Sequence, residues 1–182
     1  MPFAKKPQVF GAKINELTLG TGDKATVLGG QNVFNLYTFD APIANRPKIG
    51  IDVSDDPEQP SEGLKEFYAG CETLADRAKK AAGVAEADFV CIRFDLADPN
   101  GANKSIEDCV ADAKAVAEAI DKPLVVAGCK NSEKDADLFG KISEALQGKN
   151  ILVLSAKEEN YKGVAAGAGM AYGQKVGAES AV

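Results

Sequence analysis

Histidine is missing from all 182 positions of this sequence. Its absence removes the commonest general base, the Ser–His and Cys–His nucleophile pairs, and the commonest metal ligand. Chemistry here would therefore depend on carboxylates, lysines, tyrosines or a cofactor held by another protein. We expect no catalytic residue in this chain alone.

Closely spaced cysteines are also missing. The four cysteines stand at positions 71, 91, 109 and 129, and no two of them form a Cys-x-x-Cys pair. This spacing argues against a zinc or iron–sulfur site within the chain, so we expect no metal-binding residues in it. We expect Cys71, Cys91 and Cys109 to be small, buried side chains, and we expect no disulfides.

Long apolar runs and a surplus of positive charge are missing as well. No run approaches the roughly 18 residues of a membrane span, and the N-terminal residues MPFAKKPQVF contain no apolar signal-peptide core. The net charge of −6 argues against nucleic acid or an anionic membrane as a partner. We therefore expect a cytoplasmic protein, in which 45% apolar residues are available for a core.

The first 45 residues have a pattern of their own. Residues 8–30 alternate apolar and polar side chains on both sides of the segment GTGD (20–23). Alternation around a glycine-rich turn predicts a β-hairpin. We expect residues 1–45 to form this hairpin and a lead-in to the rest of the chain.

From residue 46 onward the pattern becomes strand, loop and helix. Apolar stretches predict strands at 48–53, 89–96, 123–128, 150–156 and 174–182. The middle three are nearly continuous apolar runs, which are typical of parallel strands buried on both faces.

Helices are predicted between these strands, over residues 105–120, 133–147 and 160–173. Ser105 is expected to cap the first of these helices, and Gly148 to follow the end of the second. Ser155 and Glu158 form a Ser-x-x-Glu pattern, which predicts a capping box before the third. The glycine-rich segment GVAAGAGMAYG (163–173) lacks dinucleotide-binding spacing, and its small residues are better explained by close packing on a sheet.

The predicted order is a β-hairpin, four strand–helix units and a fifth strand. Regular alternation of strands and helices indicates an α/β fold with a parallel sheet, either doubly wound or a (β/α)8 barrel. A barrel needs about 250 residues. Residues 46–182 would therefore supply roughly the first half of a TIM barrel, from its first strand to its fifth, with the C-terminal half absent.

Polar residues follow the strands at the end where both parallel folds bind ligands. They form the loops SDDP (54–57), DPNGAN (98–103), CKN (129–131) and KEEN (157–160). Each loop also has a structural interpretation: Asp98 to Gly101 fit a type I turn, Asn103 could lead into a helix, and Glu158 fits a capping box. Asp95 ends an apolar strand, where a barrel points side chains into its mouth, and we weigh ligand binding and a structural role equally for it.

Five segments in order resemble a known family. They are VLGG (27–30), NRPKIGIDV (45–53), FDLADPNGANKSIEDCV (94–110), KPLVVAGCKNSEKD (122–135) and KEENYKG (157–163). Together they resemble the small subunit of the corrinoid iron–sulfur protein, also called the delta subunit of acetyl-CoA decarbonylase/synthase. The resemblance spans nearly the whole chain.

The resemblance implies a (β/α)8 barrel related to pterin-dependent methyltransferases. It also implies a large partner subunit that carries the corrinoid (cobalamin) domain and a [4Fe-4S] cluster. In the Wood–Ljungdahl pathway, that complex carries a methyl group from methyltetrahydropterin or methyltetrahydrofolate to the nickel site of acetyl-CoA synthase. The small subunit would be non-catalytic and cap the corrinoid with its barrel mouth. The pterin methyltransferase and acetyl-CoA synthase would be transient partners.

On this interpretation, polar groups at the strand ends would hydrogen-bond the amide fringe of the corrin ring. The candidate cofactor-binding residues are Asp55, Asp95, Asn100, Asn103, Cys129, Lys130, Ser155 and Asn160. Two alternatives stay open: a pterin-dependent methyltransferase of the same barrel type, with Asp95 and Asn103 on the pterin, and a structural half-barrel that only assembles. Because half a barrel exposes a sheet edge and an apolar face, we expect the chain to associate with a partner or a second copy, or to be unstable.

Overall fold

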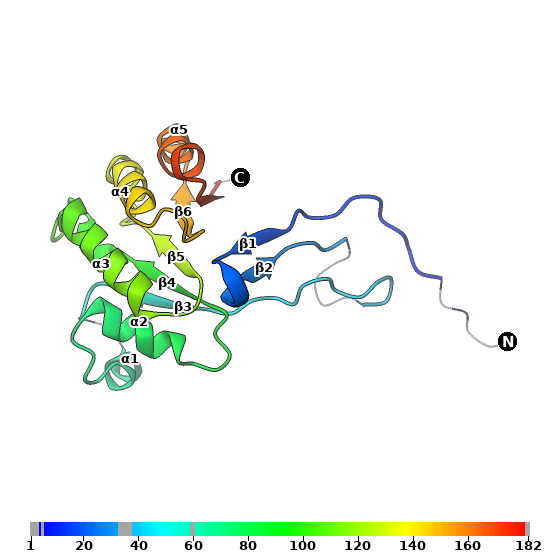
Figure 1. Cartoon of the computed structure of the whole chain (residues 1–182), viewed down its shortest axis with the longest axis horizontal. Helices are drawn as coiled ribbons and strands as arrows, with labels where there is room; N and C mark the ends of the chain where they lie inside the picture. The colour runs from blue at the N-terminus through cyan, green and yellow to red at the C-terminus, as the bar shows by residue number, and fades with distance from the viewer. Residues whose placement is uncertain (1–3, 5, 33–37, 59–60, 181–182) are drawn as a thin grey trace.

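The computed structural model describes residue 4 and residues 6–32, 38–58 and 61–180. The described elements form a two-stranded antiparallel sheet and a five-stranded parallel sheet, with the helices ranged along one side of the larger sheet (Figure 1). This is the predicted α/β architecture, and it is consistent with half of a TIM barrel.

The small sheet is the predicted hairpin. Strands β1 (Leu17–Leu19) and β2 (Thr26–Leu28) pair antiparallel, and the 3-10 turn η1 (Gly22–Lys24) lies between them. Gly20 and Gly22 have φ angles of 75° and 63°, a left-handed conformation that glycine adopts without the steric cost of a Cβ. The GTGD segment therefore closes the hairpin, although the paired strands are shorter than the alternating pattern.

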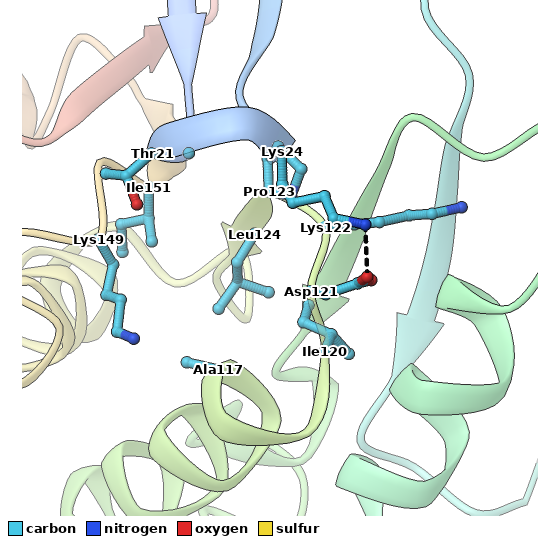
Figure 2. Close-up of a pocket in the computed structure, with 11 residues that line it drawn as sticks. Thr21, Lys24, Ala117, Ile120, Asp121, Lys122, Pro123, Leu124, Lys149 and Ile151 are labelled. Carbon is cyan, nitrogen blue, oxygen red and sulfur yellow. Dashed lines mark hydrogen bonds and ion pairs between the residues drawn. The ribbon is translucent and has the colours of Figure 1, made fainter.

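Asn150 fixes the hairpin to the N-terminal end of the parallel sheet. Its side-chain amide donates to the carbonyls of Thr18 (2.8 Å) and Gly20 (2.9 Å), and the Gly20 N–H donates to the Asn150 carbonyl (2.9 Å). Leu19, between the two carbonyls, is 0% exposed. The hairpin thus covers the end of the sheet where the parallel strands begin, and Figure 2 shows its turn above the start of the strand at Leu124.

Replacing Asn150 with glycine is expected to lower the free energy of unfolding by about 1–3 kcal/mol, because two side-chain hydrogen bonds are lost. Glycine is the appropriate replacement, since Asn150 has a φ of 52°, which alanine would adopt only with strain. Urea unfolding followed by circular dichroism measures the change. A stability equal to that of the wild type would show that these bonds do not hold the hairpin.

The parallel sheet has the order β3-β4-β5-β6-β7. Its strands are β3 (Gly50–Ser54), β4 (Phe89–Arg93), β5 (Leu124–Ala127), β6 (Leu152–Ala156) and β7 (Lys175–Ala178). Spatial order follows chain order, as in the wall of a barrel, whereas a doubly wound sheet reverses its order at a switch point. The structure therefore favours the barrel over the doubly wound alternative.

The helices are α1 (Glu62–Phe67), α2 (Leu74–Ala82), α3 (Ile106–Ala119), α4 (Ser132–Ala145) and α5 (Tyr161–Val164), which continues into a π-helical turn, η3 (Ala165–Met170). Ser105 caps α3 as predicted, since its hydroxyl accepts from the Asp108 N–H at 3.1 Å. The capping box predicted from Ser155 and Glu158 is wrong, because Ser155 lies in β6 and the helix begins only after Asn160.

The core lies between the helices and one face of the parallel sheet. Its central members, each 0% exposed, are Val90, Ile92, Val126 and Val153 of the sheet with Leu138, Phe139 and Ile142 of α4. The glycine-rich segment packs closely here, as predicted: a Cβ on Gly169 would lie 3.5 Å from Val176 of β7, and one on Gly167 would lie 3.5 Å from the Cα of Gly140 in α4.

The opposite face of the parallel sheet, which we call the open face, carries no helix among the described residues. It consists of the other alternate strand positions: Asp52, Ser54, Phe89, Cys91, Arg93, Val125, Ala127, Leu152, Leu154 and Lys175. In a complete barrel this face would point to the interior. Its centre is apolar, and most of its polar members lie on β3 and β4.

As an isolated chain, the protein is expected to self-associate. Among the described residues, no strand pairs with the outer edge of β3 or β7, and no helix covers the open face. Light scattering over a range of concentrations should show mass rising with concentration. Leu154→Asp on the open face should reduce this rise, whereas Met170→Asp, at an 86% exposed position on η3, should not. A monomer at every concentration would contradict the prediction.

Candidate functional site

The C-terminal ends of β3 to β6 meet at the end of the parallel sheet that lies opposite the hairpin. In a barrel this end is the mouth. All eight candidate residues lie in or next to its loops: seven follow a parallel strand, and Ser155 is the penultimate residue of one. Their contacts divide them into one accessible group and several that fix the loops.

Asp95 belongs to a charged group on the open face. It begins the 3-10 turn η2 (Asp95–Ala97) directly after β4, and its carboxylate accepts from the Ser54 hydroxyl at 2.6 Å and the Arg93 Nε at 2.7 Å. The Arg93 Nη1 donates to the Asp52 carboxylate. We call Asp52, Ser54, Arg93 and Asp95 the Arg93 cluster.

The Arg93 cluster is accessible to a ligand. The side chains of Asp52, Arg93 and Asp95 are 49%, 35% and 34% exposed. The hydrogen bond to Asp95 raises the pKa of Arg93 above its ordinary value. The guanidinium therefore stays charged between the two carboxylates. Such a group can both donate and accept hydrogen bonds toward the interior of a barrel.

Asp55 is buried between two of the loops. It is 4% exposed, and its carboxylate accepts from the Leu96 N–H at 3.0 Å and pairs with Lys104 at 3.3 Å. Lys104 also contacts Asp112 of α3. Burial raises the pKa of Asp55. This residue braces the loop after β3 against the loop after β4.

The DPNGAN loop contains the predicted turn. The Gly101 N–H donates to the Asp98 carbonyl at 3.0 Å, and the Asn100 N–H donates to the Asp98 carboxylate at 2.9 Å. Asn103 has a φ of 51°, and its side-chain oxygen accepts from Lys134 at 2.7 Å. Asn100 and Asn103 are both exposed, so they border the mouth while shaping its loop.

Cys129 and Lys130 are held by a buried carboxylate, that of Asp135. This side chain accepts from the N–H groups of Cys129 (2.7 Å) and Lys130 (3.0 Å), and it lies 3.2 Å from the Cys129 sulfur. Burial raises the pKa of the Cys129 thiol to about 11. Cys129 is therefore a structural thiol, while the Lys130 side chain is exposed at the mouth.

Asn160 and Ser155 complete the mouth on the side of β6. Asn160 is 7% exposed; its side chain accepts from the Lys157 N–H at 2.7 Å and donates to the Ser132 carbonyl at 2.9 Å. It therefore ties the loop after β6 to the start of α4. Ser155 is half-buried within β6.

Two members of the Arg93 cluster were not predicted as site residues from the sequence. Asp52 and Arg93 interrupt the apolar stretches IGIDV and FVCIRF, and both lie on the open face, two residues from Ser54 and Asp95 respectively. Charged residues spaced by two within a strand share one face, so the alternation of polar residues was the signal that could have found them. The contact of Asp135 with Cys129 carried no comparable signal.

Cys129 is expected to resist alkylation by iodoacetamide in the native state at pH 8. With a thiol pKa of about 11, only about one molecule in a thousand carries the reactive thiolate at that pH. Mass spectrometry of tryptic peptides should show modification of Cys129 only after unfolding in urea, and earlier modification of the half-buried Cys71. Rapid native labelling of Cys129 would contradict its assigned environment.

Comparison with known proteins places these features in a family. Among the described residues, no helix is both long and apolar enough to span a membrane. The family model of the CO dehydrogenase/acetyl-CoA synthase delta subunit matches residues 16–181.

Named relatives agree with this match. The acetyl-CoA decarbonylase/synthase complex subunit delta of Methanothermobacter thermautotrophicus is 32% identical over 160 residues, which cover 86% of this chain and 41% of the relative. The same subunit of Archaeoglobus fulgidus is 29% identical over 162 residues, which cover 85% of this chain and 36% of the relative. The chain thus spans 36% to 41% of the length of these relatives. Because the family model covers most of its residues, the chain belongs to the CO dehydrogenase/acetyl-CoA synthase delta subunit family.

Proposed function

We propose that the chain is part of a non-catalytic small subunit that caps the corrinoid of a partner subunit during methyl transfer in the cytoplasm. In this proposal the large partner carries the corrinoid and a [4Fe-4S] cluster, and a pterin methyltransferase and acetyl-CoA synthase are transient partners. The observation that carries the proposal is the Arg93 cluster, an accessible polar group at the mouth of a chain without histidine.

The residues at the mouth suit the periphery of a corrinoid. Amide side chains around a corrin both donate and accept hydrogen bonds, and the mouth offers carboxylates on Asp52 and Asp95, an exposed amide on Asn103 and an exposed ammonium on Lys130. When bound, the corrinoid would supply the cobalt that carries the methyl group.

The chain's own residues would bind and orient rather than react. Arg93 holds the carboxylates of Asp52 and Asp95 in fixed positions on the open face. Asp55, Asp135 and Asn160 hold the loops that surround them. A mouth fixed in this way can cover a flat ligand and exclude water without rearranging, which lowers the entropy cost of binding.

Binding of the corrinoid-carrying subunit tests the proposal. Titration of that subunit with the protein should change the visible absorption of the corrinoid in a saturable way and slow release of the corrinoid into an ultrafiltrate. A titration that changes neither property, together with no complex in light scattering, would overturn the proposal.

A pterin-dependent methyltransferase is the second candidate function. The observation in its favour is that Asp52 and Asp95 place two accessible carboxylates on the open face, where they could accept hydrogen bonds from the amino group and ring N–H of a pterin. Calorimetric titration of the protein alone with methyltetrahydrofolate or methyltetrahydropterin discriminates between the functions. Saturable binding without any partner would favour the methyltransferase.

A further inference from the structure

An extended arm projects from the hairpin, away from the helices and the mouth (Figure 1). We define the N-terminal arm as residues 6–16 together with residues 29–32, which lie beside them. The Ile14 N–H donates to the Gln31 carbonyl at 2.8 Å, and the Gly30 N–H donates to the Ile14 carbonyl at 3.0 Å. The two segments thus continue the pairing of β1 with β2 beyond the ends of those strands.

The base of the arm is held in place by Asn45. Its side-chain amide donates to the Gly29 carbonyl at 2.9 Å, and its carbonyl accepts from the Gln31 side chain at 3.0 Å. Further out, the Gln8 N–H donates to Asp40 at 2.6 Å. Specific hydrogen bonds therefore hold the arm at both places.

Exposed apolar side chains are frequent in the first 49 residues, on the arm and in the segment that follows it. Eight large hydrophobic residues are exposed among the described residues, and four of them lie between positions 9 and 49. Val9 is 90% exposed and Ile14 is 61% exposed. Phe10, Lys13 and Ile14 also line a surface hollow of about 540 Å³. Phe10 and Ile14, which line the same hollow, form an accessible apolar group of the kind found at interaction surfaces.

The charge of this part of the chain is opposite to that of the rest. Residues 1–49 contain six lysines and arginines against three aspartates and glutamates, which gives +3, whereas residues 50–182 contain 15 against 24, which gives −9. On the arm itself, Lys6 and Lys13 are exposed, and Glu16 is the one acidic residue; Lys13 lines the same hollow as Phe10 and Ile14. A partner that covers the arm would therefore need an acidic surface with apolar side chains in it.

We propose that the N-terminal arm is a docking element for an acidic surface on the corrinoid-carrying subunit, which rests on the proposed function for the identity of that partner. The hairpin that carries the arm is bound to Asn150, at the end of the sheet opposite the mouth. The arm can thus hold the partner while the mouth stays open to its ligand. Val9 and Ile14 supply the apolar contact, and Lys6 and Lys13 supply the charge.

Paired variants test the arm in the protein as it exists. Val9→Asp/Ile14→Asp removes the apolar contact, and Lys6→Glu/Lys13→Glu reverses the charge. Met170→Asp and Lys79→Glu/Lys114→Glu make matched changes at exposed positions on η3, α2 and α3. Calorimetry with the purified corrinoid-carrying subunit measures the dissociation constant, and circular dichroism confirms that every variant is folded. We expect both arm variants to bind about tenfold or more weakly and both controls to bind like the wild type.

Three other results would each overturn the inference, and each has a different meaning. Arm variants that bind as tightly as the wild type would remove the arm from the interface while leaving the proposed function intact. Arm variants that lose only self-association would make a second copy of the chain the occupant. A wild-type protein that does not bind the subunit at all would overturn the proposed function and the arm together.

Discussion

Replacing Gly128 with alanine is expected to lower the free energy of unfolding by about 3 kcal/mol or more, among the largest effects of any single methyl group in this chain. A Cβ built on Gly128 would lie 2.2 Å from the Asp135 Oδ1. That carboxylate has no free space to move into, because Asp135 is only 4% exposed and its oxygens accept hydrogen bonds from the N–H groups of Cys129 and Lys130. The clash must therefore break a buried hydrogen-bonded group or distort the end of β5.

Urea unfolding of Gly128→Ala measures this loss, with Gly63→Ala as the control. Gly63 lies in α1 with nothing within 4 Å of its Cβ position, so alanine there should leave stability unchanged or raise it by up to about 1 kcal/mol. Adding Asp135→Ala to Gly128→Ala should cost less than the sum of the two single changes, since it removes the clash. A Gly128→Ala protein as stable as the wild type would show that Asp135 does not occupy this position.

Replacing Arg93 with methionine is expected to weaken binding of the corrinoid-carrying subunit by about tenfold or more, with a smaller effect on stability. The guanidinium separates the carboxylates of Asp52 and Asp95, and methionine would leave two negative charges on the open face without their shared donor. Because these side chains are 34% to 49% exposed, water compensates much of the loss to folding, which we place at about 1 kcal/mol. A ligand that covers the mouth excludes that water, so Arg93→Met is expected to cost more binding free energy than folding free energy.

Arg93→Lys is the matched control, since it keeps the charge and loses the planar fork that reaches both carboxylates. Calorimetry should place its affinity between those of the wild type and Arg93→Met. Equal affinities for all three proteins would mean that the Arg93 cluster lies outside the interface. A large loss of stability without a loss of affinity would assign the cluster to folding alone.

Local patterns in the sequence predicted the parts of the fold that depend on neighbouring residues. The alternation around GTGD predicted the hairpin, and Ser105 marked the start of α3. The turn at Asp98 followed from the positions of proline and glycine. In each case the contacts that decide the conformation lie within a few residues of one another, so the sequence displays them directly.

These local patterns did not predict contacts between residues that are distant in the sequence. Asp55, a predicted cofactor-binding residue, contacts Lys104, which lies 49 positions away, and no local pattern predicts that contact. The Ser155–Glu158 pattern suggested a capping box, but pairing with β5 and β7 keeps this part of the chain in β6. Periodicity along the chain predicts neither the ion pairs between loops nor which residues pair with a neighbouring strand.

The two ends of the parallel sheet carry different kinds of surface. The mouth presents the Arg93 cluster and exposed polar loops, which suit a polar ligand. The opposite end is covered by the hairpin, whose arm presents apolar and basic side chains. Under the two proposals above, this division would let one subunit stay attached to its partner through one end while the other end meets and leaves the corrinoid.

Hydrogen–deuterium exchange tests most directly whether the mouth meets the partner. The protein is compared by mass spectrometry alone and in complex with the corrinoid-carrying subunit, with peptides that cover residues 54–58, 95–104 and 129–131. We predict slower exchange in these peptides in the complex, because their N–H groups surround the covered mouth. A complex that forms while exchange in all three peptides stays unchanged would contradict the assignment of the mouth as the corrinoid-facing surface.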